Sequence, residues 1–235
     1  MQNKSLTLAG LFIGIGLIVL GIFINCGIRS AKSMDRSVTV KGLSEMEVPA
    51  NKVIWPITYT ELGNDLQQVY NDIEAKNGKI ITFITSNGID RDEITASAPM
   101  IVDTKADRYN PNPAPYRYNA VAVVTVSSEK VDQVRELMTR QASLLKEGIA
   151  ITGDDYRFQT QFLYTKLNDV KPQMIEEATK NARASAQKFA EDSDSKLGKI
   201  KQASQGQFSI SDRDVNTPYI KSLRVVTTIE YQLKD

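Results

Sequence analysis

Hydrophobic and polar residues alternate in several stretches of the chain, which is the pattern of a strand with one buried face. The first stretch reads RSVTVKG, and the second reads EVPANKVIWPITYTEL. In the second, the large side chains of Val53, Trp55, Ile57 and Tyr59 share one face. Pro56 has no N–H to donate to a neighbouring strand, so we expect this strand at a sheet edge or at a bulge.

The same alternation predicts a hairpin of residues 92–104 and 115–127, whose strands read EITASAPMIVDTK and APYRYNAVAVVTVSS. The segment RYNPNPAPYRYN joins them, and its prolines favour an extended, stiff connection. One face of the first strand is expected to carry Ile94, Ala96, Ala98, Met100 and Val102. The matching face of the second is expected to carry Tyr116, Tyr118, Ala120, Ala122, Val124 and Val126.

Three more strands are predicted in DDYRFQTQFLYTK, KIKQASQGQFSIS and SLRVVTTIEYQL. The residues aligned on one face of the first of these are Tyr156, Phe158, Phe162 and Tyr164. Those aligned in the last are Leu223, Val225, Ile229, Tyr231 and Leu233.

Apolar residues at steps of three and four predict three helices. The first is capped by Asn64 or Asp65 and ends at SNGI, where Gly88 adopts a left-handed conformation. The second runs from Ser128 to about Leu145 and ends at KEGI. The third covers about 169–192, with Pro172 in its first turn. The inner face of the second helix is expected to carry Val131, Val134, Leu137, Met138, Gln141 and Leu145.

The order of these elements, β-β-α-β-β-α-β-α-β-β, predicts an α+β fold of mainly antiparallel sheets with three main helices packed on them. Strands that follow each other too closely for an intervening helix imply hairpins. The fold is expected to occupy residues 36–235 as one domain, after a leader and spacer at residues 1–35.

Residues 5–24 contain no charge, which is about the twenty residues needed for a helix that crosses a bilayer. A cleavable export signal has a shorter apolar region and small residues before the cut. The residues before Cys26 do not match the motif for lipid attachment. We therefore predict an uncleaved transmembrane helix first, a cleaved signal second and a lipidated Cys26 third. The charges around the segment leave the orientation open.

The composition excludes several classes of chemistry. With 29 Lys+Arg and 28 Asp+Glu, the chain lacks the basic surplus of a nucleic-acid binder. It has no histidine, which removes the commonest general base and metal ligand. Its single cysteine allows neither an intrachain disulfide nor a thiolate zinc site. No cofactor is expected.

Acidic pairs are the remaining candidates for catalysis or metal binding. Asp154 and Asp155 are adjacent, and Asp212, Asp214 and Asn216 repeat the opening of a calcium loop. That loop would continue with Gly at Thr217 and Glu at Leu223, so the match is incomplete. We expect a turn at the first site and a solvated loop at the second. A hydrolase or metal enzyme that uses acidic residues stays open as an alternative function.

Tyrosines flank the proline-rich segment and predict a contact surface, because aromatic side chains give contact area at low entropic cost. These residues are Tyr109, Tyr116 and Tyr118. Tyr116 and Tyr118 also fit a half-buried strand, which leaves Tyr109 as the expected exposed contact.

The third helix carries Ala178, Ala182 and Ala186 four residues apart, a stripe that suits close packing on a sheet. VTVKG, APYRYNAVAVVTV, the EGI after the second helix, and ATKNARASAQKFAEDSDSKLGKI together resemble the SIMPL-domain family. Two positions depart from the family pattern, because Asp194 and Asn119 stand where glycine is common.

This family includes periplasmic and outer-membrane immunogenic proteins of bacteria and an oxidative-stress defence protein. The resemblance implies export to the periplasm and implies no catalytic residues. The expected function is therefore a membrane-anchored, periplasm-facing binding or assembly module, with self-association as a candidate and a link to envelope or oxidative stress. A membrane-tethered cytoplasmic adaptor is a further alternative.

Overall fold

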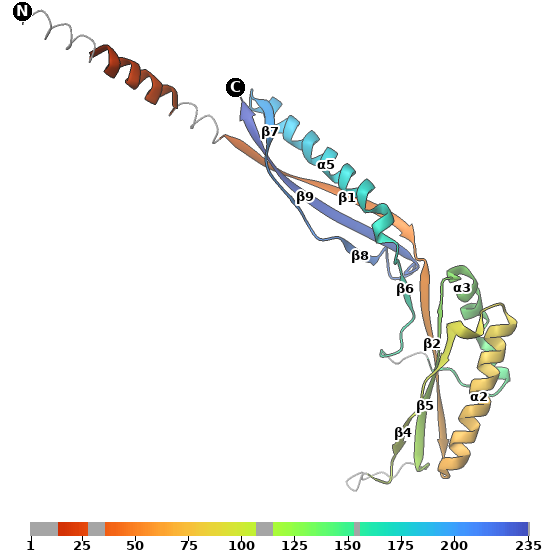
Figure 1. Ribbon diagram of the computed structural model, residues 1–235. Helices are drawn as coiled ribbons and strands as arrows, with labels where there is room; N and C mark the ends of the chain where they lie inside the picture. The colour runs from red at the N-terminus through yellow and green to blue at the C-terminus, as the bar shows by residue number, and fades with distance from the viewer. Residues whose placement is uncertain (1–13, 28–35, 107–114, 153–155, 235) are drawn as a thin grey trace, which may run out of the picture. The chain divides into compact units, whose positions relative to one another are not determined.

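The computed structural model describes residues 14–27, 36–106, 115–152 and 156–234 (Figure 1). The chain divides into two units. Unit 1 consists of Met1–Met46, Val170–Ser209 and Leu223–Asp235, and unit 2 of Glu47–Asp169 and Ile210–Ser222. Several strands and one helix therefore contain residues of both units. The expectation that residues 36–235 fold as a single domain stays a prediction.

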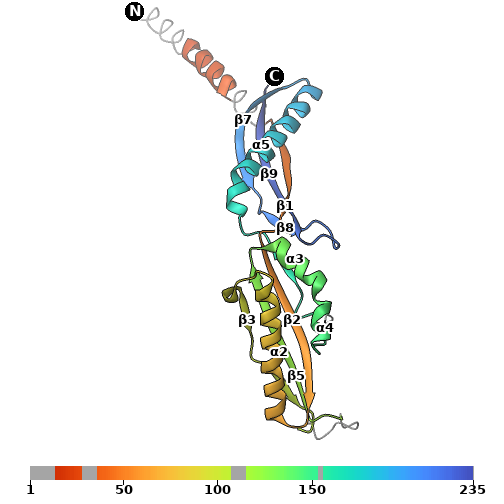
Figure 2. The same ribbon diagram turned by 90° about the vertical axis from the view of Figure 1, so that its right-hand side faces the viewer.

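The sheet of unit 1 is built around the long strand β9 (Ile220–Lys234). Its neighbours are β1 (Ser37–Pro49) on one side and β7 (Lys196–Gln205) on the other, and β8 (Ser209–Asp212) also pairs with β9. β7 and β9 are antiparallel, and the arrows of β1 and β9 run in opposite directions (Figure 1). The helix α5 (Leu167–Asp192) lies along this sheet in both views (Figures 1 and 2).

Small residues allow α5 to approach the sheet closely. Ala178, Ala182 and Ala186 are completely buried, which confirms the stripe predicted from the sequence, and Ala190 extends it. Gly42 in β1 completes the contact, because a Cβ at this position would overlap the backbone oxygen of Ala178 and lie 2.8 Å from the Ala182 Cβ. The helix and the strand thus meet almost backbone to backbone.

The sheet of unit 2 is antiparallel throughout. β2 (Lys52–Gly63) and β5 (Tyr118–Ser128) pair along their full lengths. β6 (Gln161–Leu163) pairs with the other side of β2. β3 (Ile94–Ala96) and β4 (Met100–Asp103) lie one after the other on the outer side of β5, which confirms the predicted hairpin.

Three helices belong to unit 2: α2 (Leu66–Ser86), α3 (Val131–Arg140) and α4 (Ala142–Lys146). Asp65 caps α2 by accepting the N–H of Gln68 at 2.9 Å. The left-handed glycines that end the first two predicted helices are confirmed, with φ +89° at Gly88 and +77° at Gly148. A short 3-10 turn, η1 (Arg91–Glu93), precedes β3.

The core of unit 2 lies between α2 and the predicted inner face of β2. Val53, Trp55, Ile57 and Tyr59 are all buried there, as the alternation predicts. The buried residues of α2 that face them are Val69, Ile73, Ile80 and Ile84.

One polar position interrupts the apolar stripe of α2, and the structure gives its reason. The Tyr59 hydroxyl is 2.9 Å from the Asn77 side-chain oxygen and 3.0 Å from the Ile73 carbonyl oxygen. Burial raises the pKa of Tyr59, so the phenol stays protonated and available as a donor. Asn77 thus satisfies a buried hydroxyl in place of an apolar contact.

The predicted common face of residues 94–102 is wrong, because the strand is broken between β3 and β4. Ile94 pairs with Val126, whereas Met100 pairs with Val121, a shift of one residue in register. A one-residue shift moves each following side chain to the opposite face of a sheet. Met100 and Val102 therefore point away from α2, and Ile101 lies on the α2 side.

The second predicted helix is also broken. Ser128 ends β5, and α3 and α4 meet at Gln141. Leu144, seven residues after the buried Leu137, is 1% exposed, whereas Leu145 is 57% exposed. The prediction of Leu145 as an inner residue is wrong, because the buried face of the helix passes through Leu137 and Leu144.

Two other expectations differ from the structure. The strand predicted across residues 154–166 is limited to β6, and Tyr156, 82% exposed, and Phe158 lie outside it. Helix α5 begins at Leu167, which places Pro172 inside the helix and beyond its first turn.

Pro56 is neither in an edge strand nor at a bulge, because β2 lies between β5 and β6. Its position nevertheless requires no backbone hydrogen bond to a neighbouring strand. The β6 pairing stops at Ile54, and the next bridge on that side joins Tyr59 to Ile151. The missing N–H of Pro56 thus falls in a gap between these partners.

Residues 14–27 form a helix in which Cys26 is exposed. Residues 5–13 of the predicted membrane segment lie outside the described residues. Within the part of the chain that the structure describes, no helix combines the length and the apolar character that crossing a bilayer requires.

Candidate contact surface

Exposed apolar side chains gather at one end of the unit 2 sheet, where β4, the end of β2 and the start of α2 meet. Each of these side chains is at least 40% exposed. We call them the tip surface, and they are Leu62, Leu66, Tyr70, Met100, Ile101, Val102 and Tyr116. Contiguous exposed apolar residues of this kind mark interaction sites more often than isolated ones do.

The register of the sheet places part of the tip surface on each side of the β4 edge. Leu62 and Val102 both pair with Asn119, so they flank the same residue on the face away from α2. On the opposite face, Ile101 lines a surface hollow of about 560 Å³ together with Leu66 and Tyr70. The apolar surface therefore wraps around the outer edge of β4.

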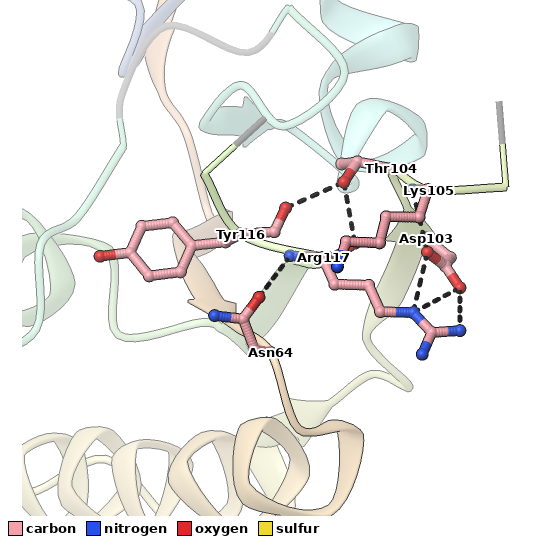
Figure 3. A network of polar contacts seen from close by, with 6 residues as sticks. All are labelled: Asn64, Asp103, Thr104, Lys105, Tyr116 and Arg117. Atoms are coloured by element: carbon pink, nitrogen blue, oxygen red, sulfur yellow. Dashed lines mark hydrogen bonds and ion pairs between the residues drawn. The ribbon is translucent and has the colours of Figure 1, made fainter. Parts of the chain in front are cut away.

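A polar network holds the base of the segment that follows β4 (Figure 3). The Arg117 guanidinium contacts the Asp103 carboxylate through Nη2 at 2.9 Å and through Nε at 3.1 Å. Thr104 donates its hydroxyl to the Tyr116 carbonyl at 2.9 Å. Asn64, from the β2–α2 junction, accepts the Arg117 N–H at 3.0 Å. Side chains from three parts of unit 2 thus fix the residues on both sides of 107–114.

The Asp103–Arg117 pair remains ionised over a wide pH range. The hydrogen bond from Arg117 lowers the pKa of Asp103, and the backbone N–H of Lys105 adds to this effect. The same contact raises the pKa of Arg117. Exposed pairs contribute little to stability, but this one has the two-point geometry that restricts orientation. Its main consequence is a defined base for the tip surface.

The three tyrosines predicted to form a contact surface have different positions. Tyr109 lies outside the described residues. Tyr116 is 45% exposed, and its ring points away from the Asp103–Arg117 pair (Figure 3). Tyr118 packs against the core of unit 2, with the Arg117 guanidinium 5.0 Å from its ring centroid. Of these three tyrosines, Tyr116 and Tyr118 lie among the described residues, and of these two only Tyr116 belongs to the tip surface.

Sequence reasoning missed most of the tip surface. Met100, Ile101 and Val102 were expected to alternate between a buried and an exposed face, yet all three are exposed. The available signal was the run of three apolar residues between Pro99 and Asp103, which is not an alternating pattern. Leu66 and Tyr70 carried no separate signal, because their spacing in the first helix also fits its buried stripe.

The acidic residues of the incomplete calcium loop bind partners within unit 2. Asp212 forms an ion pair with the buried Lys221. Asp214 accepts the N–H groups of Asn216 at 2.8 Å and Thr217 at 2.9 Å. The hydrogen bond from the Thr217 hydroxyl, which is the larger contribution, and the one from Arg213 lower the pKa of Asp214 to about 2. The geometry is that of a turn closed by an aspartate.

The other acidic candidates form no cluster either. Asp154 and Asp155 lie outside the described residues. Glu176 pairs with Lys180 at 2.6 Å on the surface of α5, and Glu177 accepts the hydroxyl of Ser44 at 2.8 Å. Among residues 14–27, 36–106, 115–152 and 156–234, no three Asp, Glu or Cys side chains converge as metal ligands would.

Unit 1 has a surface hollow of about 690 Å³ between α5 and β7. Ala190, Leu197 and Tyr231 contribute apolar walls, and Arg183 and Glu191 contribute exposed charges of opposite sign. The buried Ser195 hydroxyl at this hollow already contacts Arg36 at 3.1 Å and the Ser193 carbonyl at 3.2 Å. This arrangement offers no unsatisfied buried group to a ligand.

Comparison with known proteins bears out the resemblance drawn from the sequence motifs. No curated protein matches the chain. One family model matches residues 38–227, and its description is a SIMPL protein of unknown function (DUF541). That match covers the sheet of unit 2, all the helices from α2 onward, the described part of the tip surface and the sheet of unit 1 up to residue 227 in β9. The chain therefore belongs to the SIMPL family.

Proposed function

We propose that this protein is a non-catalytic binding module of the cell envelope, and that it makes its contacts through the tip surface. The observation that carries the proposal is the exposure of apolar side chains around a sheet edge whose base is fixed by the Asp103–Arg117 network. An apolar contact surface on a rigid base loses little conformational entropy on binding. The stress-related role implied by the family resemblance is part of this proposal.

A membrane anchor at residues 5–24 completes the proposed function. This segment contains no charge, and residues 14–27 are helical. Apolar side chains of that helix are exposed, for example Ile18 at 65% and Phe23 at 71%. Exposed apolar side chains around a helix suit a lipid environment, where their burial is favourable. The resemblance to exported proteins supports a periplasmic position for residues 36–235.

Reporter fusions test the anchor and its orientation. A phosphatase that is active only in the periplasm and a fluorescent protein that matures only in the cytoplasm are fused separately to the carboxyl terminus. We expect phosphatase activity in the membrane fraction. The matched control replaces Gly16 and Gly21 with Arg, because charges near the centre of an apolar span oppose insertion. Signal from the cytoplasmic reporter alone would overturn the periplasmic position.

A photo-crosslinking residue at position 116 tests the contact surface. The control carries the same residue at position 156, because Tyr156 is 82% exposed and does not belong to the tip surface. In living cells, we expect adducts from position 116 and none from position 156. Equal adduct formation at both positions, or none at either, would contradict a contact through the tip surface.

A further inference from the structure

We propose that the outer edge of β4 pairs with β4 of a second copy of this chain, antiparallel and with Ile101 opposite Ile101. This inference rests on the proposed contact function and names its partner. It follows from the hydrogen-bonding direction of the β4 backbone, the position of one proline and the charges along the edge.

The outer side of β4 pairs with no strand among the described residues. Thr104 donates its N–H to the Arg117 carbonyl at 2.8 Å, so residue 104 faces β5. Residues in an antiparallel ladder alternate between facing the neighbouring strand and facing away from it. The backbone N–H and C=O groups of Met100 and Val102 therefore also point toward β5. Ile101 and Asp103 direct theirs outward, where a further strand would lie.

Only one register between two β4 strands satisfies these groups. With Ile101 opposite Ile101, each copy donates its Ile101 N–H to the Ile101 carbonyl of the other. Asp103 then lies opposite Pro99 of the second copy and donates its N–H to the Pro99 carbonyl. Pro99 has no N–H to return, and the Asp103 carbonyl needs none, because it already accepts the Ala106 N–H at 3.1 Å.

The neighbouring registers are less favourable. Placing Asp103 opposite Asp103 sets two carboxylates side by side, and like charges directly opposite each other destabilise a sheet. Placing Ile101 opposite Asp103 directs the Ile101 N–H of each copy toward an Asp103 carbonyl that already accepts the Ala106 N–H. Neither register uses the missing N–H of Pro99.

The side chains support the same arrangement. In the proposed register, Met100 lies opposite Val102 of the second copy on the face away from α2. On the other face, the two Ile101 side chains meet beside the hollow lined by Leu66 and Tyr70. No charged side chain other than Asp103 lies on β4, and Arg117 of the same chain pairs with it. The edge is therefore complementary to itself.

Disulfide trapping tests the register. The full chain with Cys26→Ser and Ile101→Cys should form a disulfide-linked dimer under mild oxidation, because residues in a hydrogen-bonded antiparallel pair have Cα atoms about 5.5 Å apart, within the range for a disulfide. The matched control is Thr95→Cys in the same background. Thr95 is exposed on β3, at the same side of β5, but far from its own copy in this register.

A dimer with Ile101→Cys and none with Thr95→Cys supports the proposal. Equal yields from both variants, or no dimer from Ile101→Cys, would overturn it. Since β4 has 4 residues, we expect a weak dimer whose population rises with protein concentration.

Sedimentation equilibrium of the full-length protein, in density-matched detergent, measures the association without a covalent link. Ile101→Lys should shift the wild-type dimer to monomer at the same concentration, because it places two ammonium groups opposite each other. Ile200→Lys, on the edge strand β7 and 53% exposed, is the matched control and should leave the mass unchanged. A monomeric wild type at every concentration, or equal effects of both substitutions, would contradict the proposed pairing.

The failure of this inference and the failure of the proposed function are distinguishable. If Ile101→Cys does not link the chains but the probe at position 116 yields adducts to another protein, the tip surface binds a different partner and only the inference fails. If both experiments give no product, the proposed function fails with it.

Discussion

Unit 1 and unit 2 both place a long helix on one face of an antiparallel sheet, but the two helices present different side chains. α5 packs through completely buried alanines and meets Gly42 at backbone distance. α2 packs through Val69, Ile73, Ile80 and Ile84. The contact in unit 1 is therefore limited by available space, whereas the contact in unit 2 depends on the apolar volume that its side chains supply.

The sheet edges of the two units differ in a related way. β7 carries Lys196, Lys199 and Lys201, and its pairing with β9 contains register shifts. Charges and bulges are the usual protections against unwanted pairing of an edge strand. β4 pairs regularly with β5, its one charged side chain, Asp103, forms an ion pair with Arg117 of the same unit, and it exposes apolar side chains. Within the described residues, β7 is thus a protected edge, and β4 is the edge at which we propose that a second copy binds.

The largest expected effect comes from Gly42→Val in unit 1. The new side chain would overlap the backbone of α5 at Ala178, and neither the strand nor the helix can shift without losing its other contacts. We expect unfolding free energy to fall by more than about 4 kcal/mol, measured by chemical denaturation of the full chain.

The matched control is Gly78→Ala on α2, where a Cβ meets nothing within 4 Å. Since alanine is a better helix former than glycine, this variant should gain about 1 kcal/mol. Effects of the same sign at both glycines would show that the close approach in unit 1 is not what distinguishes the two units.

Ile80→Ala tests whether the stability of unit 2 depends on the apolar volume of the α2 side chains. Ile80 is completely buried, so truncation removes apolar contact and leaves a cavity. We expect a loss of about 2–5 kcal/mol in the unfolding free energy, followed by circular dichroism during denaturation. Leu145→Ala serves as the control, because Leu145 is 57% exposed, and it should change stability by at most about 0.5 kcal/mol.

Tyr59→Phe probes the buried hydroxyl at the apolar interface of α2. The substitution keeps the ring and removes the hydroxyl that reaches Asn77 at 2.9 Å, so the half-buried amide oxygen loses this partner. We expect a loss of about 1–3 kcal/mol, measured as a shift of the denaturation midpoint. Adding Asn77→Leu should recover part of that loss, since it removes the unsatisfied group. No recovery would mean that Asn77 has another role.

The smallest effect is expected at the base of the tip surface. Asp103→Asn removes a carboxylate whose pKa is lowered from 3.8 by its hydrogen bond with Arg117. A lowered folded-state pKa stabilises the protein above the ordinary pKa, and this contribution disappears as the pH falls through the folded-state value. The melting temperature of the variant should therefore be slightly below that of the wild type near neutral pH, and the two should converge in acid.

Asp132→Asn is the control for this pH dependence, because the Asp132 side chain is 95% exposed and forms only a local pair with Arg135 on α3. A constant difference between wild type and Asp103→Asn at all pH values would show that Asp103 acts through its shape or its turn, and not through its charge.

The sequence alone determined the α+β class, the inner face of β2, a helix cap at Asn64 or Asp65, the glycines that end the first two predicted helices and the alanine stripe of α5. Each depends on neighbours within a few residues, where backbone sterics and side-chain periodicity act directly. The family resemblance came from several such local motifs in order, which is why it was visible without a structure.

The tertiary structure decided where those periodic patterns break. The shift between β3 and β4, which places Ile101 on one face and Met100 and Val102 on the other, depends on how both strands pair with the distant β5. Which of the adjacent Leu144 and Leu145 is buried likewise depends on how α4 packs on the core. Alternation fixes faces only within an unbroken strand or helix, so the tip surface could not be assembled from sequence.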